Sequence, residues 1–507
     1  MPPHHGRRAG ICLHITSLPG PNGIGTLGAN ARWFVDRLAD CGMSVWQVLP
    51  IGPTGYGDSP YQLLSVFAGN PMLIDLPTLV ADGYLAPSDL AQFPTTATDH
   101  VEFGALFEIR TRLCEKAART FHQTASVAER SAYVEFVQQH NALWLDAFAR
   151  YQVIKAAHGQ QPWYQWPEPL RDASSEACTA YIAERADGLR TQKIIQFLFF
   201  RQWHALQEYA NTRGVKLMGD LPIYVAHDSA DTWGRRDLFQ FQDNGQLAAV
   251  GGVPPDYFSA DGQLWGNPLY DWPAHERDGF DWWIKRLRHA CALTDWVRID
   301  HFRGFEAYWS VSPDAATARD GHWAEGPGDR LFNALREAIP ALPVIAEDLG
   351  VITDEVTALR QRFALPGMAV LQFLLDEPDF APEHIAQDRV CYTGTHDNDT
   401  TTSWFAGGNE SEPHAETLAR QQRVLAITNG AADTVAIDLV AVAMNSPAQM
   451  AIVPMQDCLG LPSAARFNIP GTTDGNWRWR LQTAQFDDAL VDVLRTMIEH
   501  GERRVVM

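Results

Sequence analysis

The feature that most constrains this fold is a repeated alternation of short apolar segments with longer helical patterns. Each apolar segment is rich in β-branched or other hydrophobic residues and ends in polar ones, which is typical of a buried strand. The segments are Ile11–Thr16, Val45–Pro50, Lys216–Tyr224, Trp296–Phe302, Val344–Leu349, Met368–Phe373, Val390–Thr395 and Met450–Pro454. Strands that alternate with helices in this way predict an α/β fold, a (β/α)8 TIM barrel whose active site lies where the strands end.

The length of the chain predicts large insertions into this barrel. Such barrels need roughly 250 residues, whereas this chain has 507. We expect a single catalytic barrel domain over residues 1–507, with a mostly helical insertion at 53–215. A second insertion, at 226–294, is rich in Gly, Pro, Trp and Asp, which is typical of a long functional loop. A barrel helix is predicted over Ala31–Cys41, with Gly42 as its C-terminal stop.

Charge and cysteine content narrow the classes of partner and compartment. The net charge of −21 disfavours nucleic acid and anionic membrane surfaces as partners. Seven cysteines, an odd number without CxxC spacing, predict reduced thiols in a cytoplasmic protein. Arg7 and Arg8 could belong to an export signal, but His14 and Pro19 interrupt the apolar core that such a signal requires. No apolar run approaches the ~18 residues of a membrane helix.

Acidic side chains follow four of the predicted strands. Because side chains alternate along a strand, Arg298 and Asp300 share one face, which we expect to point into the barrel mouth. The same alternation turns Glu347 inward, and Asp220 and Asp397 follow two further strands. A single acid at a strand end is usually a helix cap or a turn residue. Four inward acids are harder to explain in this way, because burying like charges costs stability unless chemistry uses them.

Two chemistries could use such acids. Paired carboxylates suit glycosidic bonds, where one ionised group attacks while a protonated one donates to the leaving oxygen. Metal ligation is the alternative, with ligands that would be His396, Asp397, Asp399, Asp300 and His301. The chain has no HxH or HExxH spacing there, and a neighbouring arginine would repel a cation. We therefore expect neither a metal nor another cofactor.

Aromatic residues in turn-rich segments add a second indication of a sugar ligand. Most of the 17 tryptophans are expected in the core. Tyr56, Tyr61 and Trp265 instead lie among glycines, prolines and polar residues, where aromatic rings are available to the apolar faces of sugars.

Three motifs resemble those of the amylomaltases, which are 4-α-glucanotransferases or disproportionating enzymes. They are Arg298–Gly304 (RIDHFRG), Ala346–Gly350 (AEDLG) and Gly394–Asp399 (GTHDND). Further matches follow in family order along nearly the whole chain, at Ser59–Gln62, Gly219–Ile223, Gly252–Phe258, Trp265–Tyr270 and Asn468–Thr472.

The resemblance implies a (β/α)8 barrel with inserted subdomains, retaining chemistry and no metal. By motif, Asp300 is similar to the nucleophile, Glu347 to the general acid/base and Asp397 to the carboxylate that stabilises the distorted sugar. The residues implied to bind substrate at the donor sugar site are Tyr61, Asp220, Arg298 and His396. Those implied to lie on a flexible loop over the cleft are Gln263, Trp265 and Asn267, and Tyr56 is similar to a position linked to a second glucan site. Apart from Tyr56, that second site matches poorly.

The expected activity is transfer of a segment of an α-1,4-glucan, or maltooligosaccharide, to the 4-hydroxyl of another glucan or of glucose, by a retaining double displacement. Two alternatives remain open. An α-amylase-type retaining hydrolase would use the same carboxylates, because the choice of acceptor depends on how well the loops exclude water. A barrel that binds glycans without catalysis is the alternative of another class.

Overall fold

The computed structural model describes residues 6–55, 58–93, 98–242, 245–255, 261–408 and 414–504, and its centre is one sheet of eight parallel strands. The strands are β1 (Arg8–Cys12), β2 (Val45–Gln47), β3 (Lys216–Leu221), β6 (Trp296–Ile299), β9 (Val344–Ala346), β10 (Gly367–Val370), β11 (Arg389–Tyr392) and β12 (Met450–Pro454). Their order is β10–β11–β12–β1–β2–β3–β6–β9. Ala346 N, at the end of β9, donates to Pro366 O, next to β10 (2.8 Å). This bond closes the sheet, and the predicted (β/α)8 barrel is confirmed.

Each of the eight predicted segments overlaps one barrel strand, although the first strand lies earlier than predicted. β1 begins at Arg8, while Ile15 and Thr16, predicted as strand, belong to a short 3-10 helix over Ile15–Ser17. A charged residue at the start of a strand argues against a buried position. Here the guanidinium of Arg8 lies over the ring of Trp296, 5.3 Å from its centroid, so the charged end packs on a flat apolar surface.

Helix α1 (Ala29–Cys41) shows how the sequence pattern produces a barrel helix. Phe34, Leu38 and Cys41 recur at helical spacing and are buried together. Gly42 then takes a left-handed conformation (φ 82°), and its N–H donates to the carbonyls of Leu38 and Ala39. The predicted helix and its stop are confirmed.

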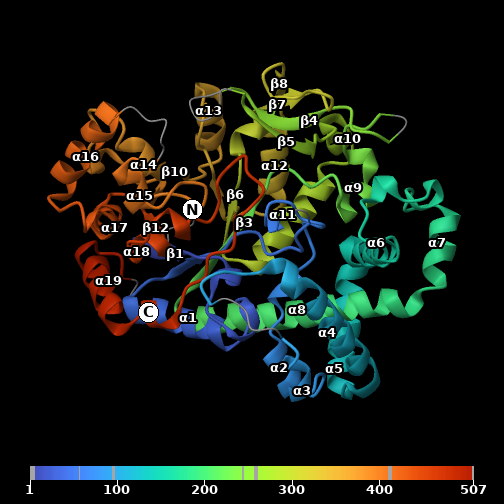
Figure 1. Cartoon of the computed structure of the whole chain (residues 1–507). Helices are drawn as coiled ribbons and strands as arrows, with labels where there is room; N and C mark the ends of the chain where they lie inside the picture. Colours follow the sequence, from blue (N-terminus) through green and yellow to red (C-terminus); the bar gives the residue numbers. More distant parts are fainter. Residues whose placement is uncertain are drawn as a thin grey trace.

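The chain between β2 and β3 is helical for most of its length. Its helices are α2 (Leu76–Ala81), α3 (Pro87–Leu90), α4 (Phe103–Thr124), α5 (Val127–His140), α6 (Asp146–Ala157), α7 (Glu176–Ala183) and α8 (Ala186–Thr212). In Figure 1, α4–α7 lie to the right of the barrel and below it, and the long α8 runs across the lower part of the view, with α2, α3 and α5 below it. α8 leads directly into β3.

The chain from 226 to 294 contains short helices and two strands. The helices are α9 (Ala230–Gly234), α10 (Trp272–Arg277) and α11 (Asp281–Leu293). Strands β4 (Val250–Val253) and β5 (Gln263–Pro268) join β7 (Ala307–Val311) and β8 (His322–Glu325) in a four-stranded antiparallel sheet, at the top of Figure 1. The sequence did not predict this sheet. A Cβ on Gly252 would lie 2.4 Å from Gln263 O, so β4 requires glycine at this position. Glycine is uncommon in strands, and for that reason the sequence pattern did not indicate one here.

The other helices complete the layer around the barrel. They are α12 (Gly328–Ala338), α13 (Asp354–Arg362), α14 (Leu371–Leu374), α15 (Thr401–Ala406), α16 (His414–Thr428), α17 (Val435–Asn445), α18 (Met455–Cys458) and α19 (Asp488–His500). All seven cysteines fall within the described ranges, and each is a free thiol. Among the helices that the structure describes, none is both long and apolar enough to cross a bilayer.

The junction between β9 and β10, where the barrel closes, is held by one buried carboxylate. Asp348 Oδ1 accepts a hydrogen bond from Met368 N at 2.8 Å. Its Oδ2 lies 3.3 Å from Arg360 Nε and also pairs with Arg389. Asp348 therefore points outward to β10, β11 and α13, on the face of the chain opposite to Glu347, as the alternation of side chains predicted.

We predict that Asp348→Ala lowers the free energy of unfolding by about 3–5 kcal/mol, because it removes a buried carboxylate that pairs with buried Arg360 and with Arg389. Chemical denaturation measures this loss. Asp329→Ala is the control, since Asp329 and its partner Arg362 are both largely exposed, and exposed pairs contribute about 0–1 kcal/mol. Equal losses in the two variants would contradict the role given to Asp348.

Candidate active site

One guanidinium at the carboxyl ends of the strands contacts two carboxylates. Arg298 Nη1 donates to Asp220 Oδ1 and Oδ2 at 2.8 and 2.6 Å, and its Nη2 donates to Asp300 Oδ1 at 2.8 Å. Tyr61 Oη donates to Asp220 Oδ2 at 2.7 Å. The side chains of Arg298 and Asp220 are 4% and 0% exposed, whereas Asp300 is 29% exposed. Of the two carboxylates bonded to Arg298, Asp300 is thus the one that a ligand can reach.

A second pair follows β11. His396 Nε2 lies 3.3 Å from Asp397 Oδ2. The ring of His396 stacks on the ring of Tyr61 with centroids 5.1 Å apart, which joins this pair to the Arg298 group. Burial opposes ionisation of Asp397, but His396 and the amide of Asn468 outweigh it and lower the pKa of Asp397. Its side chain is 45% exposed, so an ionised oxygen is available to a ligand.

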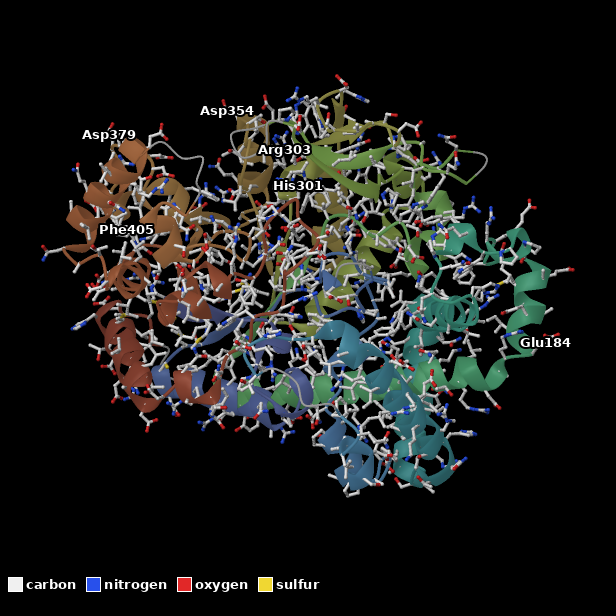
Figure 2. All side chains as sticks on the ribbon, viewed as in Figure 1. Glu184, His301, Arg303, Asp354, Asp379 and Phe405 are labelled. Carbon is white, nitrogen blue, oxygen red and sulfur yellow. The ribbon has the colours of Figure 1, made fainter. Side chains whose placement is uncertain are left out.

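Glu347, directly after β9, lies close to Asp300. Its Oε2 accepts from His301 N at 2.6 Å, and its Oε1 accepts from Leu349 N at 2.9 Å. The residue bonded to Glu347 thus follows Asp300 immediately in the sequence, so the two carboxylates are positioned by the same turn. In Figure 2, His301 lies toward the middle of the molecule, whereas Glu184 lies at its right edge.

The two carboxylates differ in how readily they ionise. Burial raises the pKa of Glu347, and the charge of Asp300 raises it further, to about 7, although Arg298 and the two backbone N–H groups oppose the shift. Burial also raises the pKa of Asp300, against the effect of Arg298. We expected Arg298 to keep Asp300 ionised. Arg298 does act to lower the pKa of Asp300, but burial outweighs it and the pKa is raised to about 6. Because Arg298 donates directly to Asp300, we infer that Asp300 ionises before Glu347.

Strand β5 carries the three residues that were expected on a loop over the cleft. The ring of Trp265 contacts the ring of His301 edge-on, with centroids 4.8 Å apart, and its Nε1 donates to Gln263 Oε1 at 3.2 Å. Asn267 is buried, and its Nδ2 donates to Val225 O at 2.7 Å. Trp265 and Gln263 therefore lie beside the acids, whereas the amide of Asn267 bonds to the protein backbone. Tyr56 lies outside the described residues.

The sequence analysis assigned no role to three residues that contact this site. Asn468 Nδ2 donates to Asp397 Oδ1 at 2.6 Å, and Arg466 Nη2 donates to Asp397 O at 2.5 Å. The ring of Trp477 lies 5.8 Å from Tyr61 and 5.9 Å from His396. Only the resemblance at Asn468–Thr472 marked this region, since a single amide or tryptophan in a loop carries no chemical pattern of its own.

Two non-glycine residues beside the site adopt left-handed backbone conformations, His301 (φ 53°) and Trp477 (φ 65°). Each such residue costs of order 1–3 kcal/mol and persists only where the surroundings enforce it. The turn at His301 directs its N–H to Glu347 directly after the strand that ends with Asp300. Strain thus accompanies the positioning of both carboxylates.

The alternative of a metal site depended partly on Asp399. Its carboxylate accepts from Ser463 Oγ at 2.6 and 2.8 Å and from Thr400 N at 2.7 Å. Asp399 therefore holds the loop and does not join Asp300. Within the described ranges, no group of three or more His, Cys, Asp or Glu side chains is arranged to hold a metal ion.

The arrangement brings together an accessible carboxylate bonded to a guanidinium, a buried carboxylate with a higher pKa and a third carboxylate whose pKa is lowered. An ionised carboxylate can attack an electrophilic carbon, while a protonated neighbour donates to the leaving oxygen. These are the requirements for breaking a glycosidic bond with a covalent intermediate.

Comparisons with known proteins match nearly the whole chain to 4-alpha-glucanotransferases. The family model described as 4-alpha-glucanotransferase matches residues 13–485. The 4-alpha-glucanotransferase of Thermus thermophilus is 46% identical over 503 residues, which cover 98% of this chain and 99% of that protein. The chloroplastic/amyloplastic enzyme of Solanum tuberosum is 41% identical over 96% of this chain and 84% of its own length. The structure of the amylomaltase from Streptococcus agalactiae in complex with acarbose matches with a TM-score of 0.93 at 33% identity, covering 98% of this chain and 100% of that one.

We predict that Glu347→Gln raises thermal stability more at alkaline than at acidic pH. The pKa of Glu347, about 7 in the folded protein, exceeds the ordinary value of about 4.3 expected after unfolding. The folded state therefore binds this proton more tightly, and wild-type stability falls as pH rises through that window. Glutamine does not titrate and avoids the loss.

Thermal denaturation at about pH 5 and about pH 8 measures the effect, because these values bracket most of the titration. Exposed Glu337→Gln is the control for removing one negative charge from the protein. A Glu347→Gln increment that is the same at both pH values would show that Glu347 titrates normally.

Proposed function

The chain belongs to the family of 4-α-glucanotransferases and transfers α-1,4-glucan segments between maltooligosaccharides, and we propose that Asp300, Glu347 and Asp397 perform this transfer by a retaining double displacement. The observation that carries the proposal is the asymmetric carboxylate pair: Asp300 is accessible and bonded to Arg298, while Glu347 is buried with a raised pKa. That difference gives the two groups distinct roles.

In the first step, an ionised Asp300 oxygen attacks the anomeric carbon of the donor sugar. The bond from that carbon to the bridging oxygen breaks, and the Glu347 proton passes to this oxygen, so that a neutral chain with a free 4-hydroxyl leaves. Asp300 becomes a neutral glucosyl ester while Glu347 becomes the anion. The total charge of the Asp300–Glu347 pair is therefore the same before and after the step.

Formation of the ester also prepares Glu347 for the second step. The charge of Asp300, which raises the pKa of Glu347 in the free enzyme, is absent from the ester. Glu347 is then a stable anion that accepts the proton of an incoming 4-hydroxyl, whose oxygen attacks the anomeric carbon and releases Asp300. One α-1,4 bond is broken and one is formed.

Five residues support the proposed donor sugar site. Asp397 has a lowered pKa and an exposed oxygen, so it can accept hydrogen bonds from sugar hydroxyls. Tyr61 and His396 form a stacked pair that offers a flat surface, and Arg298 holds Asp220 beside them. Hydroxyl acceptors and an aromatic surface together suit a hexose ring.

Family membership favours transfer over the two alternatives, an α-amylase-type hydrolase and a non-catalytic barrel. We further propose a cytoplasmic enzyme that acts as one catalytic domain over 1–507, with insertions at 53–215 and 226–294. Seven free thiols support that location. The net charge of −21 supports a neutral glucan, and not a nucleic acid, as its partner.

With maltotriose as the only substrate, we predict glucose together with chains longer than maltotriose, because the acceptor is a sugar. Chromatography of the products measures both. Asp300→Asn should reduce turnover by roughly a thousandfold or more, since it removes the nucleophile, and exposed Asp329→Asn is the control. Products shorter than the substrate alone would contradict transfer and indicate a hydrolase.

We predict that Trp265→Ala increases hydrolysis relative to transfer. Trp265, in β5, contacts His301, directly after Asp300, and we propose that its ring covers an acceptor sugar. Loss of a large apolar contact should weaken acceptor binding by about 1–3 kcal/mol, and water then competes better for the ester. The ratio of reducing ends released to chains lengthened measures the change.

Trp33→Ala is the matched control, because Trp33 is a partly buried tryptophan that packs against Phe486 near α19. It should reduce stability without changing the product ratio. If Trp265→Ala behaves in the same way, Trp265 packs the sheet and does not select the acceptor.

A further inference from the structure

A buried carboxylate that the proposed reaction does not use lies directly after β12. Asp457, in α18, is 1% exposed. Its Oδ2 accepts from Thr393 Oγ1 at 2.5 Å and from Thr401 Oγ1 at 2.8 Å, and its Oδ1 accepts from Thr401 N at 2.8 Å. Three donors from two residues of one neighbouring connection thus converge on this carboxylate.

These two threonines are the ends of the connection that carries His396 and Asp397. Thr393 is the first residue after β11, and Thr401 is the first residue of α15. Both are fully buried. A carboxylate that binds Thr393 and Thr401 together therefore fixes the distance between the two ends of the connection, and with it the path of the residues in between.

The segment that begins with Asp457 contacts the same connection at three further points. Ser463 Oγ donates to the carboxylate of Asp399 at 2.6 and 2.8 Å. Arg466 donates to the carbonyl of Asp397, and Asn468 donates to its carboxylate. Asp457 is the innermost of these contacts, because the later ones come from partly or fully exposed residues.

The cost of burying Asp457 indicates that its bonds matter. A buried carboxylate is destabilising unless donors satisfy it, and here burial raises the pKa of Asp457 while the threonine donors oppose the shift. An ionised carboxylate is a pure acceptor with two oxygens, so it can receive two hydroxyls and one backbone N–H at the same time. A neutral amide in the same place has only one oxygen to offer.

We propose that Asp457 is a positioning residue, which sets the placement of His396 and Asp397 at the donor sugar by holding Thr393 and Thr401 on one carboxylate. The inference rests on the role proposed above for Asp397. Asp457 does not touch the reacting atoms, and it acts through the connection alone.

The test is the double variant Thr393→Val and Thr401→Val. Valine has nearly the shape of threonine, so the variant removes two hydroxyl donors and leaves the Thr401 N bond in place. The chain contains a matched control at the start of α2. Asp75 accepts from Thr26 Oγ1 at 2.6 Å, from Thr78 Oγ1 at 2.6 Å and from Thr78 N at 2.9 Å. Thr26→Val with Thr78→Val removes the same kinds of bond elsewhere.

We expect kcat with maltotriose to fall by about 10- to 100-fold in the Thr393/Thr401 variant, the effect of misplacing a group by about 1 Å, while KM changes little. Asp397 raises the pKa of His396 against the effect of burial. A displaced Asp397 should therefore lower the His396 pKa, as measured by NMR titration with His396→Gln to assign the resonance. The Thr26/Thr78 variant should change neither quantity.

The inference is overturned if both double variants lose thermal stability equally and neither changes kcat or the His396 titration. Asp397→Asn, measured in parallel, separates this outcome from failure of the proposed function. Full activity in Asp397→Asn would overturn the role of Asp397 and the inference with it. If the Thr393/Thr401 variant does not fold, Asp457→Asn replaces it, with the same two readouts and the same outcomes.

Discussion

The site depends on one cation that is shared by two acids. Arg298 is almost fully buried between Asp220 and Asp300, and without it two carboxylates would face each other in a medium that screens charge poorly. The pair Asp300 and Glu347 then differs because only Asp300 receives the guanidinium. The other contacts surround these charges: Tyr61 stacks on His396, and the turn at His301 directs a backbone N–H to Glu347.

The same strands serve both chemistry and closure of the barrel. Adjacent residues Glu347 and Asp348 point to opposite faces, and the first joins the acids while the second binds β10 and two arginines. This is possible because successive side chains of a strand point to opposite faces, so two neighbouring residues can serve the site and the barrel wall. The loops supply what the strands cannot, which is an aromatic surface and the amide donor Asn468.

Sequence reasoning predicted what depends on local pattern. The parity of Arg298, Asp300 and Glu347 followed from strand alternation, and the stop of α1 followed from Gly42. It did not predict the sheet of β4 and β5, where Gly251 and Gly252 replace the usual strand formers because a Cβ would collide with Tyr224 or Gln263. It gave Asn468 no role either, because Asp397 lies 71 residues away in the chain, and only the closed barrel brings the two together.

The position of Asp348 has a consequence for how this enzyme responds to heat. Glu347, the proposed proton donor, is covalently next to Asp348, which contacts the following strand. Local opening of that pair would displace Glu347 even while most helices are still formed. Loss of activity on heating would then depend on this one pair of strands and need not coincide with unfolding of the whole barrel.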